Sequence, residues 1–327
     1  MEQRTFPRLG RRVGVVGLGA WQLGADWGTV SEHDAAAVLD AAVESGVTFV
    51  DTADVYGDGR SEQLIGRFLR GRPDAGLTVA TKMGRRVAQA PEAYTLANFR
   101  EWTDRSRRNL GTDTLDLVQL HCPPTAVFAD DAVFDALDTL VAEERVAGYG
   151  VSVETSDQAL TAIARPGVAS VQIILNALRH KPLDRVLPAA AAAGVGIVAR
   201  VPLASGLLSG RYDEHTTFAL DDHRAYNRHG EAFDVGETFS GVDFELGLAA
   251  VRRLAPLVGD ARTTAQFALR WVVDQPGVTV VIPGARDAAQ ARDNAAVAGQ
   301  PPLSGRDLAA VARVYDELVR PRVHDRW

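Results

Sequence analysis

The chain has 327 residues, of which 46% are hydrophobic and 24% charged, an ordinary globular composition that argues against disorder or a fibrous repeat. Its net charge of −7 and its lack of a basic stretch argue against a nucleic-acid partner. The single cysteine, Cys122, excludes an intrachain disulfide. No apolar run approaches the roughly 18 residues of a membrane span or forms the core of a signal peptide, so we expect a cytoplasmic protein with no membrane partner.

Short apolar runs rich in β-branched residues predict strands along the chain. Each is continuously apolar rather than alternating, which is typical of parallel strands that are covered by helices. From the second run onward, each gap is long enough for a helical crossover between parallel strands. The eight candidates are Val13–Leu18, Val47–Asp51, Leu77–Lys82, Leu115–Leu120, Val146–Val151, Ser170–Leu175, Val195–Val201 and Gly277–Ile282.

Helix boundary signals fall within the gaps. Ser31 predicts a helix start, and Gly46 predicts the end of the same helix. The other signals are helix ends at Gly71 and Gly111, capping boxes from Thr155 to Gln158 and from Thr263 to Gln266, and Pro182 in a first helical turn.

Eight such strand and helix units predict a closed (β/α)₈ TIM barrel of the α/β class, forming a single domain over residues 1–327. We also expect an N-terminal β-hairpin cap and a long loop, Ser205–Gly241, after the seventh strand. Because active-site loops lie at that end of a barrel, this loop is expected to cover a cofactor or substrate. The competing fold, a doubly wound open sheet, usually carries GxGxxG after its first strand, and this chain lacks that motif.

Ionisable residues follow three consecutive predicted strands, where barrel enzymes place catalytic groups. Asp51 and Tyr56 follow the second strand, Lys82 ends the third, and His121 follows the fourth. Each alone could be a solvated loop residue, but together they predict a site. Lys82 is the most informative, because all but two of the 35 basic residues are arginine. A lysine retained there indicates a need for a compact ammonium.

Tyr56 is the expected partner of that ammonium. A tyrosine with its ordinary pKa of about 10 is a weak acid at neutral pH, whereas a cation about 4 Å away contributes roughly 4 kcal/mol at an effective dielectric of about 20. We therefore expect Lys82 to lower the pKa of Tyr56, Asp51 to hold Lys82, and His121 to orient a substrate oxygen. General acid catalysis supplies only about 10²–10⁴-fold, so a cofactor is expected to supply the rest.

The segment from Gly46 to Gly57, containing Asp51-Thr-Ala-Asp-Val-Tyr56-Gly, followed by Ser61-Glu62 and Gly66, resembles the signature of the aldo-keto reductase superfamily. Lys82 and His121 occupy the spacings of the other two members of its catalytic tetrad. The resemblance implies a barrel in which the tyrosine protonates a carbonyl oxygen while NADPH delivers a hydride. The aspartate and lysine tune the tyrosine, and the histidine orients a small carbonyl or alcohol substrate.

The resemblance also implies cofactor contacts. Ser152 and Gln172 match partners of the nicotinamide carboxamide, although Val153 replaces the usual asparagine. Arg200 stands where many members stack a tyrosine on the nicotinamide, and Arg286 is placed to pair with a 2′-phosphate, which favours NADP(H). The full predicted cofactor set is Gly19, Ala20, Trp21, Asp51, Ser152, Gln172, Arg200, Val201, Pro202, Leu203, Ser205, Gly206, Leu208, Arg211, Ile282, Gly284, Arg286, Gln290 and Asn294.

Other polar and aromatic residues have simpler interpretations. Trp21 either walls the substrate pocket beside Tyr56 and His121 or packs against the N-terminal segment. Cys122 is expected to be a small buried residue rather than a nucleophile. No metal site is expected, because Asp51, Asp54 and Asp58 do not have calcium-loop spacing. The histidines of the long loop are expected to be solvated: His215, His223 and His229.

Two further functions remain open at this point. One is a catalytically slow, NADP(H)-binding redox-sensing module, similar to the channel-associated β-subunits of the same superfamily. The other is an aldolase that forms a Schiff base through Lys82.

Overall fold

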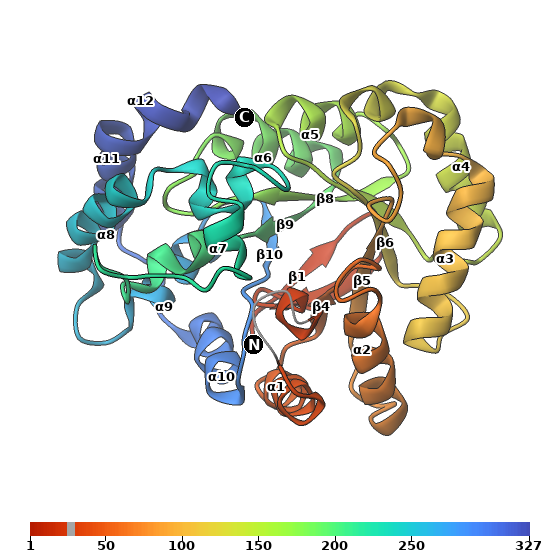
Figure 1. Cartoon of the computed structure of the whole chain (residues 1–327), viewed down its shortest axis with the longest axis horizontal. Helices are drawn as coiled ribbons and strands as arrows, with labels where there is room; N and C mark the ends of the chain where they lie inside the picture. Colours follow the sequence, from red (N-terminus) through yellow and green to blue (C-terminus); the bar gives the residue numbers. More distant parts are fainter. Residues whose placement is uncertain (25–29) are drawn as a thin grey trace.

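The computed structural model describes residues 1–24 and 30–327. Figure 1 shows helices arranged around a central set of strands. Within the described residues, an eight-stranded parallel sheet runs in sequence order from β3 to β10. Parallel bridges from Val16 to Val281 and from Gly19 to Gly284 join its first and last strands, so the sheet closes into the predicted α/β barrel.

The barrel strands are short and buried. Most of them begin or end within about three residues of the predicted positions. Their bounds are β3 Leu18–Gly19, β4 Phe49–Asp51, β5 Thr78–Met83, β6 Leu117–His121, β7 Tyr149–Ser152, β8 Val168–Ile174, β9 Gly196–Arg200 and β10 Val278–Val281.

Helices cover the outside of these strands. Helices α1 and α10 lie side by side across the seam where β3 meets β10 (Figure 1). The bounds are α1 Glu32–Glu44, α2 Arg60–Gly71, α3 Leu96–Leu110, α4 Asp131–Ala142, α5 Ser156–Ile163, α6 Pro182–Ala193, α7 His223–Tyr226, α8 Phe244–Val258, α9 Thr264–Val273, α10 Ala288–Ala296, α11 Gly305–Val314 and α12 Arg320–Val323.

The sequence signals for helix ends are confirmed at most positions. Ser31 caps α1 through its side chain, and both predicted capping boxes are present. Gly111 ends α3 with φ of 72°, a left-handed conformation that costs glycine little. Gly71 behaves differently, because it is the last residue of α2 itself and the chain leaves the helix at Arg72.

The predicted first strand, Val13–Leu18, is wrong in its extent. Its start belongs to an antiparallel hairpin of β1, Gln3–Phe6, and β2, Arg11–Gly14, while the barrel strand β3 begins only at Leu18. One apolar run thus contributes to two sheets, and its hydrophobicity does not show where the first strand ends and the second begins.

The hairpin closes the amino-terminal end of the barrel. Phe6 and Val13 pack with inward-facing residues of the barrel strands, and the Phe6 ring stacks on Phe49 with centroids 5.7 Å apart. These apolar side chains fill the amino-terminal end of the barrel interior. Polar side chains that can take part in a reaction are therefore expected at the carboxyl ends of the strands. No helix in the described part of the chain is long and apolar enough to cross a membrane.

Candidate active site

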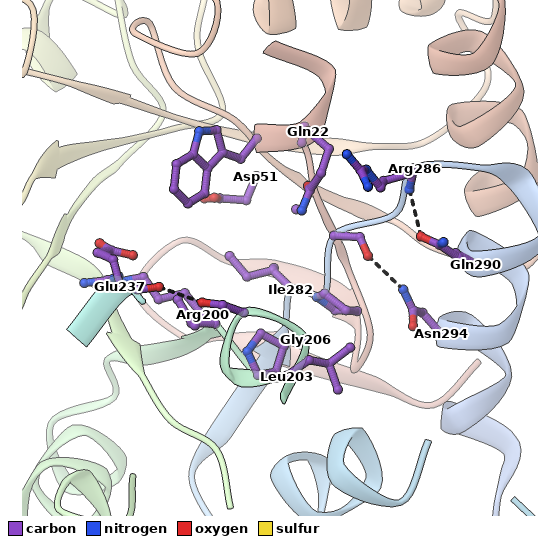
Figure 2. A pocket seen from close by; sticks show the side chains of 18 of the residues that line it. Gln22, Asp51, Arg200, Leu203, Gly206, Glu237, Ile282, Arg286, Gln290 and Asn294 are labelled. Carbon is purple, nitrogen blue, oxygen red and sulfur yellow. Dashed lines mark hydrogen bonds and ion pairs between the residues drawn. The ribbon is translucent and has the colours of Figure 1, made fainter. Parts of the chain in front are cut away.

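A cavity of about 410 Å³ lies at the carboxyl ends of the barrel strands. Five strands contribute their final residue to its wall: Gly19 of β3, Asp51 of β4, His121 of β6, Ser152 of β7 and Arg200 of β9. Loops after β3, β9 and β10 complete it, and Figure 2 shows Gln22, Leu203 and Ile282 around the same space. The barrel therefore brings together residues that are far apart in the sequence.

Lys82 links Asp51 to Tyr56 beneath this cavity. Its ammonium donates hydrogen bonds to Asp51 Oδ1 at 2.5 Å, to the Thr52 carbonyl at 2.9 Å and to the Tyr56 hydroxyl at 3.2 Å. The lysine side chain is only 1% exposed. A buried cation is expensive unless it is paired, and these partners satisfy all three of its donors.

The pKa of Tyr56 departs from the expected direction. Burial raises the pKa of the phenol, and the opposing effect of the nearby Lys82 ammonium does not reverse that increase. The expectation of a net decrease is therefore wrong, because a sequence reveals the cation but not the depth at which the phenol is buried. Burial lowers the pKa of Lys82, but Asp51 and Tyr56 more than offset this and raise it overall, so Lys82 stays charged.

Two buried amides hold the second oxygen of Asp51. Gln172 Nε2 donates to Asp51 Oδ2 at 2.7 Å, and Gln119 Nε2 donates to the same oxygen at 3.2 Å. Asp51 is therefore fixed on both oxygens, and Lys82 is fixed in turn. Gln119 was missed by the sequence analysis, because a lone amide within a buried apolar strand carries no spacing signal.

His121 lines the cavity as a neutral imidazole. Burial, together with the charges of Arg85, Lys82 and Arg200, lowers its pKa well below the ordinary value. Its Nδ1 is buried and has no hydrogen-bond partner among the described residues, which leaves Nε2 as the ring nitrogen available to a ligand. The imidazole edge meets the Tyr56 ring with centroids 5.9 Å apart. A ligand oxygen between them can contact both groups.

The geometry of these residues agrees with the comparison of the whole sequence to known families. The sequence model described as the aldo/keto reductase family matches residues 15–316, nearly the entire barrel. The chain belongs to this family.

Relatives of this aldo/keto reductase share its length as well as its fold. Aldo-keto reductase YhdN of Bacillus subtilis is 28% identical over 296 residues, covering 89% of this chain and 86% of the relative. A glycerol dehydrogenase structure from Gluconobacter oxydans is 28% identical, with a TM-score of 0.79 over 97% of this chain and 96% of that one. An aldo-keto reductase from Klebsiella pneumoniae, solved in complex with NADPH, is 25% identical, with a TM-score of 0.71 and 96% coverage of each chain.

The segment after β9 has an unusual backbone. Val201, Ala204 and Ser205 have φ of 52°, 47° and 54°, values that are rare outside glycine and that cluster at ligand sites. Asn176 supports this bend by donating to the Val201 carbonyl at 2.8 Å. Gly206 follows with φ of 95°, in a conformation that favours glycine and lets a ligand approach the backbone closely. The segment therefore fits an anionic group such as a pyrophosphate.

The other end of the cavity is formed after β10. Gln290 accepts a hydrogen bond from the Arg286 backbone N–H at 3.0 Å, and Asn294 donates to the Gly284 carbonyl at 3.1 Å (Figure 2). These contacts hold Gln290 and Asn294 in the wall of the cavity. Thr263, Gln266 and Asp293 also line this end.

Arg200 is held by an ion pair that the sequence analysis missed. Its Nη1 lies 2.5 Å from Glu237 Oε1, and its Nη2 donates to the Val153 carbonyl at 3.0 Å. The two side chains are only 8% and 10% exposed. Burial raises the pKa of Glu237, but Arg200 and Arg85 outweigh it and lower that pKa overall, so the carboxylate is charged. Glu237 comes from the long loop, which packs against β9.

Most of the predicted site residues line the cavity, and two do not. Lys82 lies below it, touching Tyr56, and Leu208 is packed into the hydrophobic core because its side chain points away from the ligand space. Val153, at the family's usual asparagine position, is also fully buried in that core. The lining residues that were not predicted are Gln22, Arg85, Ser209, Tyr212, Arg224, Phe233, Glu237, Thr263, Ala265, Gln266, Pro283 and Asp293.

Aromatic residues enclose the cavity above Tyr56. Trp21 stacks on Tyr56 with ring centroids 5.9 Å apart, which supports its interpretation as a pocket wall. The rings of His223 and Phe233 also pack against Trp21, with centroids 5.3 and 6.0 Å from that of Trp21. The expectation that His223 is solvated is wrong: it is 0% exposed, whereas His215 and His229 are exposed. The long loop folds back on Trp21, and the sequence does not show this.

Asp54 is a buried carboxyl without a visible partner. It is 1% exposed, and neither of its oxygens has a hydrogen-bond partner among residues 1–24 and 30–327. Burial, aided by the nearby Glu62, raises its pKa to about 7. Within the described residues, no group of three or more potential ligands is arranged to hold a metal.

Asp54→Asn is expected to stabilise the protein at pH 8.5 and to stabilise it less at pH 5, where only part of the effect has developed. An aspartate titrates near 4 in an unfolded chain, so the folded state binds the proton more tightly. Stability therefore falls as the pH rises from about 4 to about 7 and stays lower above that. The full difference is at most about 4 kcal/mol. Urea unfolding at both pH values measures it. Asp74→Asn, at an exposed position, is the matched control; equal effects of Asp54→Asn at the two pH values would contradict the prediction.

Proposed function

We propose that this aldo/keto reductase reduces an aldehyde or ketone to an alcohol with NADPH, reversibly, with Tyr56 as the general acid and base. The observation that carries the proposal is the Lys82 ammonium, which bonds both Asp51 and the Tyr56 hydroxyl at the floor of the cavity. We further propose that the chain acts as a single cytoplasmic domain over residues 1–327.

Each side chain around the carbonyl oxygen has its own role in the proposed reaction. The Tyr56 hydroxyl donates its proton to the carbonyl oxygen, and Lys82 stabilises the phenolate that remains. His121, neutral, donates from Nε2 to the same oxygen and sets its direction. Trp21 and Phe233 cover this corner and restrict water. When bound, NADPH supplies the hydride that the protein's own groups cannot provide.

The residues at the two ends of the cavity support an assignment for each part of the cofactor. Ser152 and Gln172 would hydrogen-bond the nicotinamide carboxamide. Gln172 would do so through its carbonyl oxygen, because its amide nitrogen already donates to Asp51. The bend at Val201–Gly206 takes the pyrophosphate, and Gln290 and Asn294 take the adenine. Arg286 pairs with the 2′-phosphate, and this favours NADPH over NADH. The bound NADPH of the Klebsiella relative supports this assignment.

The Schiff-base aldolase is disfavoured by the state of Lys82. An amine nucleophile must lose its proton, whereas the raised pKa of Lys82 and its ion pair with Asp51 keep it charged.

A cofactor-consumption screen tests the proposed reaction. Purified protein is mixed with NADPH and a panel of aldehydes, ketones and sugars, and with NADP⁺ and the matching alcohols. We expect loss of NADPH absorbance with at least one carbonyl class. Tight NADPH binding without turnover across the whole panel would contradict the proposal and favour the redox-sensing alternative.

A further inference from the structure

Arg85 is a charged residue of the cavity that the proposed chemistry does not use. It follows β5 closely, and lines the same space as Trp21, Tyr56 and His121. Its charge is close enough to His121 to be the largest electrostatic cause, after burial, of the lowered pKa of that imidazole. Arg85 therefore lies at the substrate end of the cavity rather than at the adenosine end.

The guanidinium of Arg85 has unused donors. Its Nη2 donates to Glu154 Oε1 at 3.2 Å, and no other hydrogen bond or ion pair of this side chain is found in the described part of the chain. The side chain is 22% exposed, and its Nε and Nη1 atoms are not fully buried. Nε and Nη1 thus have no protein partner in the described part of the chain and are accessible, in a side chain that lines the cavity.

Two carboxylates near this corner are paired with buried cations. Asp51 is neutralised by Lys82, and Glu237 by Arg200. Burial and the nearby Asp234 raise the pKa of Glu154, the partner of Arg85. A negative group entering beside Arg85 therefore meets a cation whose charge is only partly compensated.

We propose that Arg85 binds an anionic group of the substrate, so that the enzyme favours aldehydes and ketones that carry a carboxylate at a distance from the carbonyl. This rests on the proposed function. The guanidinium carries five N–H donors, so Nη1 can donate to a carboxylate while Nη2 keeps Glu154. The same carboxylate anchors the substrate so that its carbonyl oxygen reaches Tyr56 and His121.

The test compares 4-carboxybenzaldehyde with its neutral carboxamide analogue, 4-formylbenzamide. The wild-type enzyme is expected to show a higher kcat/KM for the carboxylate. Arg85→Met should reduce that value by about 10- to 100-fold, mainly through KM, and leave the carboxamide within about threefold. Arg85→Lys should restore part of the preference. Arg86→Met, at the neighbouring exposed arginine that pairs with Asp58, is the matched control and should change neither substrate.

Glu154→Gln provides a second, independent measurement. Removing the carboxylate that accepts the hydrogen bond from Arg85 should lower KM for 4-carboxybenzaldehyde and leave 4-formylbenzamide unchanged. This variant keeps the proposal testable even if Arg85→Met does not fold.

Three results would overturn the proposal: no carboxylate preference in the wild type, equal losses for both substrates in Arg85→Met, or no change in KM for the carboxylate in Glu154→Gln. Failure of the proposed function is a different result, since neither aldehyde would then consume NADPH.

Discussion

Replacing Tyr56 with Phe is expected to lower kcat for carbonyl reduction by about 10²–10⁴-fold, the usual contribution of a well-placed general acid. The change removes one oxygen and keeps the ring that stacks on Trp21. Since cofactor contacts are untouched, NADPH affinity should stay close to that of the wild type. Stopped-flow hydride transfer and a separate binding titration measure the two quantities.

Tyr149→Phe is the matched control for Tyr56→Phe. Tyr149 begins β7, at the opposite end of the barrel, and its hydroxyl donates to Asp138 at 2.7 Å. The Tyr149→Phe variant should have a lower free energy of unfolding than the wild type but the same kcat. A Tyr56→Phe enzyme as fast as the wild type would remove the basis of the proposed mechanism.

The pH profile of the Tyr56 reaction has an expected form. Reduction needs the protonated phenol, and burial raises the pKa of Tyr56 above its ordinary value of about 10. The rate of reduction should therefore stay level through the neutral range and fall only in alkali, while alcohol oxidation should rise with pH.

Glu237→Gln is expected to destabilise the protein by about 3–5 kcal/mol, because it leaves Arg200 buried without its counterion. The effect follows from burial, since both side chains are almost fully enclosed. Denaturant unfolding measures it, and the double variant Glu237→Gln with Arg200→Met should recover most of the loss, because the uncompensated charge is then gone.

Glu214→Gln supplies the comparison for Glu237→Gln. Glu214 pairs with Arg252 at 2.5 Å on the surface, where the two side chains are 59% and 61% exposed. Removing that carboxylate should change the free energy of unfolding little, because water screens an exposed pair. Similar costs for the two substitutions would show that the Arg200 pair is not sealed from water.

The barrel and the tetrad could be predicted because each leaves a local signal. Continuous apolar runs mark buried parallel strands, and Lys82 stands out in a chain that otherwise uses arginine almost throughout. The strand that failed, Val13–Leu18, failed because a single apolar run feeds both the hairpin and the barrel.

The remaining site residues depend on how distant segments meet. Gln119 acquires its role only when β6 places it against Asp51, and Glu237 acquires its role only when the long loop returns to β9. The wrong direction for the pKa of Tyr56 has the same origin: the sequence supplies the neighbouring cation, but burial is a property of the folded chain.

The hydroxyl of Ser205 has a mechanical consequence. It donates to the Glu237 carbonyl at 2.9 Å and accepts from the Phe239 N–H at 3.1 Å, so the bend after β9 and the loop bearing the counterion of Arg200 are tied at one atom. The backbone that carries the Glu237 carboxylate is therefore held in place by a residue of the bend. One hydroxyl thereby fixes the spacing between two segments that wall the cavity, so the shape of that wall depends on a single serine.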